Sequence, residues 1–158
     1  MVVMDVYTRR TIGFGVAADL EGIRVCQMFN RATVRQTTAR RLSSDHDSLF
    51  RFQLPNLRLL EVDEIKTISG TPRSHAFVER LIGTIRRECP DRIWFWHRSD
   101  LQRKLDNYKA FYNQYRCHTG LAGETPAQRG GALAPRSHAS TNRWRQRCNA
   151  LFQTPAAA

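Results

Sequence analysis

The sequence predicts a single α/β domain in which a mixed β-sheet is flanked by helices. Short runs of β-branched and aromatic residues, Val2–Tyr7 and Thr11–Ala17, are typical of strands. Further along, the apolar residues of 77–85 and 101–115 recur every three or four positions, which is the period of an amphipathic helix. A chain of 158 residues is long enough for one domain with a core and short for two. We therefore expect one domain followed by a tail.

The first segments predict a hairpin and then a helix. The polar stretch Thr8–Arg10 is short enough to join the two apolar runs as antiparallel strands. Asp19 can cap a helix that fades by about Gln36. The apolar positions Ile23, Cys26 and Phe29 recur at roughly helical spacing, with Val25 and Met28 beside them.

An acidic turn follows the next predicted strand. Arg40–Ser44 is a short strand in this interpretation, and Asp45-His46-Asp47 is the turn after it, because aspartate side chains favour turns. This arrangement places Asp45 at the carboxyl end of a strand. The alternation of Leu57–Val62 predicts a further strand.

A helix rich in arginine is expected after a loop. Lys66–Arg73 contains a Ser-Gly-Thr-Pro sequence, which is typical of a flexible loop, and Ser74 can cap the helix that follows. The apolar stripe of this helix consists of Phe77, Val78, Leu81, Ile82 and Ile85. Glu79, Gly83 and Arg86 fall at positions i, i+4 and i+7 of a different face. We therefore expect Glu79 to point away from the core, beside a basic side chain.

A second long helix precedes the tail. Within Asp100–Tyr115, steps of four and three separate the apolar residues Leu101, Leu105, Tyr108, Tyr112 and Tyr115. This helix is expected to pack on the sheet or on a partner subunit. Beyond Gln128 the chain is rich in Gly, Ala, Ser, Pro and Arg and has no sustained period. We divide the chain into a core over residues 1–129 and a basic, flexible tail over residues 130–158.

The charge of the chain points to a polyanionic partner. Lysine and arginine number 25 against 14 acidic residues, which gives a net charge of +11. Phosphate groups attract such a protein by releasing their counterions, so nucleic acid is the leading candidate partner. A basic protein that binds no nucleic acid is the alternative, and charge does not separate an enzyme from a passive binder.

Cysteine usage and hydropathy indicate a cytoplasmic protein. Association with the nucleoid is the expectation that follows from nucleic acid as partner. The four cysteines form no Cys-x-x-Cys pair, so neither a zinc site nor a disulfide framework is predicted: Cys26, Cys89, Cys117 and Cys148. The apolar run at the start is only a few residues long and contains Asp5, which is far short of a signal sequence or a membrane span. We expect no membrane partner.

Several motifs in order carry a family resemblance. They are Val3–Phe14, Ser44–Asp47, Val78–Arg80, and Tyr112–Leu121 followed by Thr125–Gln128. This order resembles that of bacterial insertion-sequence transposases, and over about residues 2–129 the chain looks like a catalytic core of the retroviral-integrase type.

The resemblance implies a ribonuclease H-like fold with two aspartates and a glutamate that bind two Mg²⁺ or Mn²⁺ ions. By position, Asp45 matches the second aspartate, in preference to Asp47, and Glu79 matches the glutamate. In that family the first aspartate lies on the strand before the one at Val2–Tyr7, and we find no counterpart for it. We therefore expect the first strand to be missing and the metal site to be incomplete. Asp5 is the possible substitute, and a structural role in the hairpin is the favoured alternative for it.

Basic side chains near the expected site are candidate DNA contacts: Lys66, Arg73, Arg80, Arg86 and Arg87. A solvated surface is the alternative interpretation of each. We expect Glu88 to be an exposed partner of Arg87 or Arg92. The run Ile93–Trp96 resembles a base-stacking platform, but such a run more often indicates a buried corner.

The implied activity is metal-dependent DNA cleavage and strand transfer, with double-stranded DNA as substrate and a homo-oligomer as the working form. Direct transesterification needs no covalent intermediate with the enzyme, so no nucleophilic serine or cysteine is required. The truncation leaves open that the chain is inactive. The alternative from another class is a DNA-binding or subunit-association remnant without chemistry, and a third is a nuclease of the same fold adapted by the host.

Overall fold

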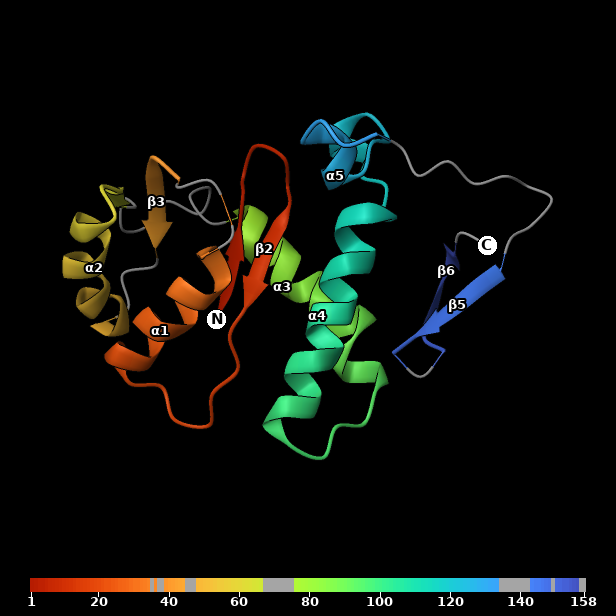
Figure 1. Ribbon diagram of the computed structural model, residues 1–158, viewed down its shortest axis with the longest axis horizontal. Helices are drawn as coiled ribbons and strands as arrows, with labels where there is room; N and C mark the ends of the chain where they lie inside the picture. Colours follow the sequence, from red (N-terminus) through yellow and green to blue (C-terminus); the bar gives the residue numbers. More distant parts are fainter. Residues whose placement is uncertain are drawn as a thin grey trace. The chain divides into compact units, whose positions relative to one another are not determined.

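The computed structural model describes residues 1–34, 36, 39–44, 48–66, 76–133, 143–148 and 150–156 (Figure 1). The chain divides into two compact units. The first contains Met1–Val3 and Ile12–Ile82, and the second contains Met4–Thr11 and Gly83–Ala158. None of the helices in these described ranges combines the length and the apolar character that a bilayer crossing requires.

The α/β class predicted from the sequence is confirmed. Within the described part of the chain, the strands pair as three separate two-stranded sheets, β1–β2, β3–β4 and β5–β6, where the sequence predicts a single mixed sheet. The strands of the first two sheets are β1 (Val2–Met4), β2 (Thr11–Phe14), β3 (Arg41–Ser44) and β4 (Asp63–Lys66). The main helices are α1 (Gly22–Thr33), α2 (Gln53–Leu59), α3 (Ala76–Glu88), α4 (Arg98–Gln114) and α5 (Pro126–Arg129), and short 3₁₀ turns lie at Ser48–Phe52, Pro90–Arg92 and Thr119–Leu121.

The strands β1 and β2 form the predicted hairpin but are shorter than expected. The amide of Asp5 donates to the carbonyl of Arg10 at 2.9 Å, which is the last pairing before the turn. Asp5 then accepts hydrogen bonds from the Tyr7 amide at 3.0 Å and from the Thr8 hydroxyl at 2.6 Å. These bonds hold the backbone in a turn, so the strand ends where the sequence pattern alone would extend it.

Two glycines allow α1 to pack closely against the segment of β2. A Cβ at Gly13 would lie 2.7 Å from Ala32 Cβ, and one at Gly15 would lie 2.5 Å from Met28 Sδ. Both distances are below van der Waals contact, so any larger residue would push the helix away. The Gly-x-Gly spacing therefore has a packing role.

The helix α1 differs from its prediction in its cap and in its buried face. Glu21 stands at the N-cap position and makes no side-chain cap bond, so the prediction that Asp19 caps the helix is wrong. Val25 and Phe29 are buried, whereas Ile23 is 64% exposed. The buried face of α1 therefore includes Val25 and Phe29 but not Ile23, so it is rotated around the helix axis relative to the predicted face.

The predicted strand at Leu57–Val62 is wrong, because these residues end α2 instead. The amide of Val62 donates to Leu57 O at 2.9 Å and that of Glu61 donates to Arg58 O at 3.2 Å. Glu61 has a φ of 54°, so these bonds form a Schellman motif with Glu61 in the left-handed conformation. Leu57 and Val62 meet Phe29 in the core of the first unit, with Met1, Val3 and Leu42 packed around them. The alternation in the sequence reflects this apolar contact across the helix end.

In the second unit, the long helix α4 is confirmed. His97 caps it, since its side chain accepts from the Asp100 amide at 3.2 Å. Leu105, Tyr108 and Tyr112 are buried along the predicted stripe.

The region assigned to a tail contains a hairpin of β5 (Arg143–Arg147) and β6 (Phe152–Ala156). The ring of Phe152 stacks on Phe111 of α4 with centroids 4.3 Å apart, and the Tyr115 hydroxyl lies 3.5 Å from Pro155 O. The turn of this hairpin has positive φ at Cys148 and Ala150, and neither is glycine. The sequence therefore lacks the usual hairpin signal. The domain boundary at residue 129 stays a prediction.

Candidate functional site

The carboxyl ends of β3 and β4 lie at the same edge of a parallel pair. Ser44, the last residue of β3, is the register partner of Lys66, the last residue of β4. The Ser44 hydroxyl also donates to Glu64 Oε1 at 3.1 Å, so Glu64 has a partner within the pair. Asp45 is the first residue beyond the strand, at the end the sequence predicts. Asp45 and Asp47 themselves lie outside the described residues.

Glu79 is exposed in the first turn of α3. Leu81 and Ile85 are buried, whereas Glu79 and Arg86 are exposed, so the predicted outward face is confirmed. The predicted apolar stripe is confirmed at Leu81 and Ile85 but not at Phe77, which is 37% exposed. The positive end of the helix dipole stabilises a carboxylate in a first turn. A single face of α3 therefore offers a carboxylate to solvent and, two turns later, a guanidinium.

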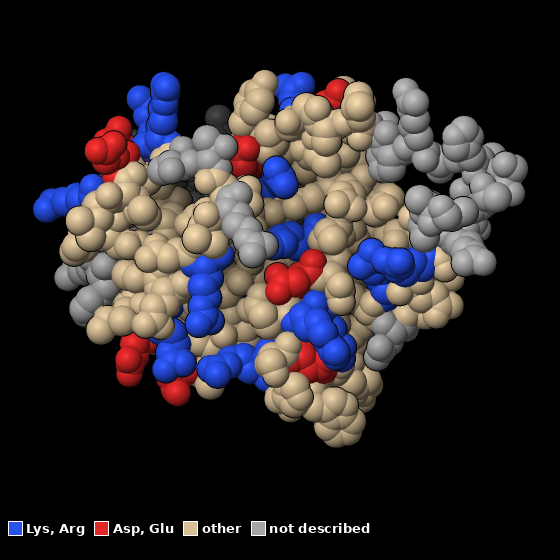
Figure 2. Space-filling view, viewed as in Figure 1, with Lys and Arg blue, Asp and Glu red and all other residues tan. Residues whose placement is uncertain are grey.

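Of the other candidate DNA contacts, the structure describes Arg80, Arg87 and the backbone of Lys66, but not Arg73. Arg80 and Arg87 of α3 are exposed, as a phosphate contact requires. Lys66 closes β4, and Arg73 lies outside the described residues. Basic side chains are scattered over the face drawn in Figure 2 and are not gathered into one patch there. Contact of these residues with DNA stays a prediction.

Asp5 has a structural role in the hairpin turn. One carboxylate oxygen accepts from the Tyr7 amide and the other accepts from the Thr8 hydroxyl. A metal ion would have to compete with both bonds. The favoured sequence interpretation of Asp5 therefore agrees with its contacts.

Glu88, the last residue of α3, binds the segment after α4. Arg116 Nε donates to Glu88 Oε2 at 3.1 Å, Arg116 Nη2 donates to Oε1, and the Tyr108 hydroxyl donates to Oε2 at 2.7 Å. The predicted partner is therefore corrected to Arg116, while Arg87 acts on Glu88 only through its charge. Burial raises the pKa of Glu88, but hydrogen bonds from Arg116 and Tyr108 outweigh burial and hold this pKa below its usual value.

Two further residues of the Tyr112–Leu121 motif also have structural contacts. Asn113 Nδ2 donates to Thr11 O at 2.8 Å, and the Thr11 amide donates to Asn113 Oδ1 at 2.9 Å. The ring of His118 meets the ring of Tyr112 edge-on, with centroids 4.9 Å apart. Burial and the charge of Arg116 lower the pKa of His118. Within the second unit, this motif therefore connects α4 to Thr11 at the start of β2 and to Glu88 at the end of α3.

Comparison with known proteins bears on the same helices. Residues 62–126, which include all of α3 and α4, match the integrase core domain family. We call residues 62–126 the integrase core segment after this match. The uncharacterized 39.2 kDa protein of insertion element IS476 from Xanthomonas euvesicatoria is 24% identical over 130 residues. The alignment covers 81% of this chain and 38% of that relative, so the chain spans well under half of the relative's length. The resemblance to an insertion-element integrase core is thereby confirmed.

The donors of the integrase core segment suit a divalent ion in kind but fall short in number. Carboxylate oxygens are the ligands that Mg²⁺ and Mn²⁺ prefer, and the exposed Glu79 supplies one carboxylate. Across the residues that the structure describes, no three His, Cys, Asp or Glu side chains group as metal ligands. A metal site that includes Glu79 would need further oxygen donors, and Asp45 stays the predicted one.

Sequence reasoning missed the bond between Glu88 and Arg116 because the partners are 28 positions apart. No local period connects residues at that separation. The signal available was indirect: both residues lie close to motifs of the family resemblance.

Proposed function

We propose that this chain is the DNA-processing core of an insertion-element transposase, with a ribonuclease H-like topology. It catalyses metal-dependent DNA cleavage and strand transfer, and Asp45 and Glu79 are its metal ligands. The observation that carries this proposal is the exposed face of α3 inside the integrase core segment, where Glu79 and Arg86 lie on the same side of the helix about two turns apart. Because the chain covers only 38% of the IS476 relative, the activity of a whole transposase is part of the proposal.

In this proposal the acidic residues bind the metal ion and the basic residues contact the DNA backbone. A bound Mg²⁺ or Mn²⁺ would neutralise charge at the phosphate under attack. Arg80, Arg86 and Arg87 hold the DNA backbone beside Glu79, and so do Lys66 at the end of β4 and Arg73 from the segment that follows it. The carboxyl edge of β3 supports the position of Asp45, since Ser44 ends that strand beside Lys66. Double-stranded DNA is the partner, and a homo-oligomer is the form that joins two DNA ends.

A nicking assay tests the proposal. The substrate is a supercoiled plasmid that carries the DNA flanking the coding sequence, incubated with Mg²⁺ or Mn²⁺. The purified chain should convert this plasmid to the open-circular form, and Glu79→Gln and Asp45→Asn should each abolish the conversion. Glu21→Gln is the matched control, because Glu21 is exposed and makes no side-chain cap bond. Asp5→Asn should leave nicking unchanged if Asp5 acts only in the turn.

The same assay separates the two classes of function. Equal nicking by the wild-type chain and Glu79→Gln would contradict the assignment of Glu79. DNA binding without nicking under any metal condition would instead favour the non-catalytic remnant.

A further inference from the structure

The segment between the 3₁₀ turn at Pro90–Arg92 and α4 exposes two indole rings. Trp94 is 87% exposed and Trp96 is 91% exposed, while Phe95 between them is 47% exposed. Ile93 at the start of the segment is buried, so the predicted buried corner holds for Ile93 and is wrong for both tryptophans. Exposed aromatic side chains that follow one another in this way form an apolar surface of the kind that marks interaction sites. We call Ile93–His97 the tryptophan loop.

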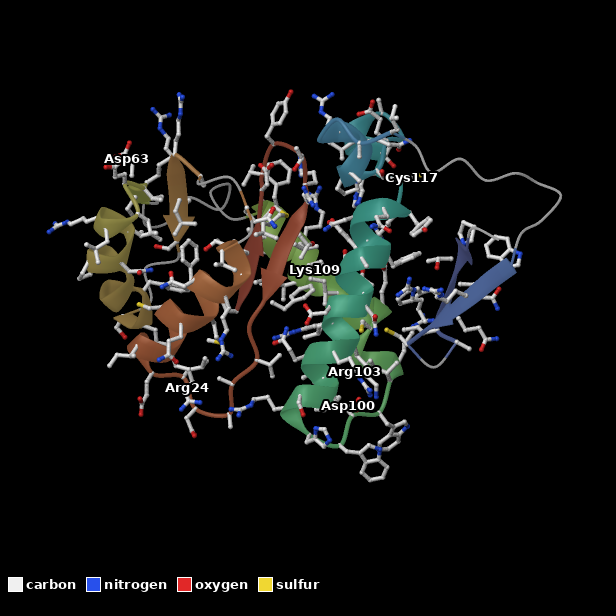
Figure 3. The ribbon with its side chains drawn as sticks, viewed as in Figure 1. Arg24, Asp63, Asp100, Arg103, Lys109 and Cys117 are labelled. Carbon is white, nitrogen blue, oxygen red and sulfur yellow. The ribbon has the colours of Figure 1, made fainter. Side chains whose placement is uncertain are left out.

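The tryptophan loop is held at both ends. The Lys104 ammonium donates to the carbonyl of Trp94 and to Asp100 Oδ2, the latter at 2.9 Å. His97 caps α4 through the Asp100 amide, and the Ser99 hydroxyl lies 2.8 Å from His97 Nδ1. The loop is therefore anchored to the first turns of α4, where Figure 3 places Asp100 and Arg103. A loop fixed in this way loses little conformational entropy when it binds a ligand.

The charge around the tryptophan loop is positive. Arg92 and Arg98, on either side of the loop, are exposed. Asp100 is bound by two cations, Arg103 at 2.7 Å and Lys104 at 2.9 Å, so it does not offset the remaining arginines. From residue 86 to residue 104 the chain has six basic residues against three acidic ones. A basic rim around flat aromatic faces fits a polyanion that itself has flat aromatic faces.

We propose that the tryptophan loop is a stacking site for unpaired nucleotides. Trp94 and Trp96 stack on exposed bases, and Arg92 and Arg98 contact the phosphates on either side. Paired DNA hides the faces of its bases, so this site selects strands that are frayed, cut or single. The inference rests on the proposed function only in taking DNA as the partner, and it requires neither the metal nor Glu79.

The test compares single-stranded with duplex DNA in the presence of a chelator. The probes are a fluorescein-labelled oligothymidine of about 15 nucleotides and a blunt hairpin duplex of similar size, followed by fluorescence anisotropy with the full chain. Trp94→Ala and Trp96→Ala should each weaken oligothymidine binding by about tenfold and duplex binding by less than about twofold. Trp94→Phe, which keeps an aromatic face, should restore part of the affinity. Trp144→Ala is the matched control, because Trp144 is 58% exposed on β5, and it should bind both probes as the wild-type chain does.

Three results would overturn the stacking site. The first is oligothymidine binding that survives in the variant lacking both tryptophans, which would leave the nicking proposal untouched. The second is an equal loss for both probes, since that would indicate a general phosphate contact or a disturbed fold. The third is a wild-type oligomer that the double variant converts to monomer in sedimentation, which would make the loop a subunit interface. A wild-type chain that bound neither probe would contradict this inference and the proposed function together.

Discussion

Arg116 and Glu88 form a two-point ion pair that joins the last residue of α3 to the segment just after α4. The centroid of the Tyr112 ring lies 5.6 Å from Arg116 Cζ. The Tyr108 hydroxyl donates a further hydrogen bond to Glu88. Glu88 is nine positions from Glu79, and at about 100° per residue this is about two and a half turns, so the two side chains leave opposite sides of the helix. The ion pair therefore holds the end of α3 through the side of the helix opposite to Glu79 and leaves the side with Glu79 exposed.

The first prediction concerns this ion pair. Arg116→Ala should lower the free energy of unfolding by about 1–2 kcal/mol, since both groups are partly exposed and Glu88 keeps Tyr108. Arg116→Lys should recover less than half of the loss, because an ammonium cannot make two parallel bonds. Urea unfolding followed by circular dichroism measures both values.

The control for this prediction is Lys109→Ala. Lys109 pairs with Asp106 at 3.7 Å on the partly exposed surface of α4, and its loss should cost less than about 0.5 kcal/mol. An effect of Arg116→Ala as small as that of Lys109→Ala would contradict a structural role for the pair.

The second prediction is a pH dependence that His118 causes. Burial lowers the pKa of folded His118 from 6.5, as do the charges of Arg116 and Arg9, while Glu88 acts in the opposite direction. As the pH falls below about 6.5, the unfolded chain takes up a proton that folded His118 does not, so stability falls. This loss stops once the pH is below the folded pKa.

Unfolding free energies measured between about pH 7.5 and pH 5.5 check this prediction, because carboxylates titrate mainly below that range. The slope of the wild-type chain should exceed that of His118→Gln. The prediction fails if the two slopes are equal, because the other histidines would then account for the change.

The third prediction concerns Asn113, whose side-chain amide bonds both the backbone amide and the backbone carbonyl of Thr11, as a neighbouring strand would. Asn113→Ala leaves the buried amide and carbonyl of Thr11 without the two bonds of 2.9 and 2.8 Å. The free energy of unfolding should fall by about 2–4 kcal/mol. Gln114→Ala, one position later on the exposed side of α4, should change it by less than about 0.5 kcal/mol. A small effect at Asn113 would show that water replaces the side chain readily.

Local periodicity predicted which residues of a long helix are buried and which are exposed. The stripes of α3 and α4 are long and regular, so the exposure of Glu79 and Arg86 follows from spacing. The strand predicted at Leu57–Val62 failed because an apolar contact across a helix end resembles strand alternation.

Local sequence patterns did not predict contacts between residues that are distant in the sequence. The partners of Glu88, and the packing of Phe152 on Phe111, depend on residues that are distant in sequence. The exposure of Trp94 and Trp96 likewise depends on how the Lys104 and His97 contacts hold the loop. Composition alone predicts burial for two tryptophans beside an isoleucine.

The pairing of Asp45 with Glu79 at one metal is the central claim, and metal-directed backbone cleavage tests it most directly. Fe²⁺ with ascorbate and peroxide generates hydroxyl radicals, and a bound Fe²⁺ concentrates the cuts in the chain near its own site. The account predicts cuts near residue 45 and near residue 79 in the same sample, both suppressed by excess Mg²⁺ and both absent in Glu79→Gln. Cuts near only one of these positions, or cuts near residue 79 that persist in Asp45→Asn, would contradict it.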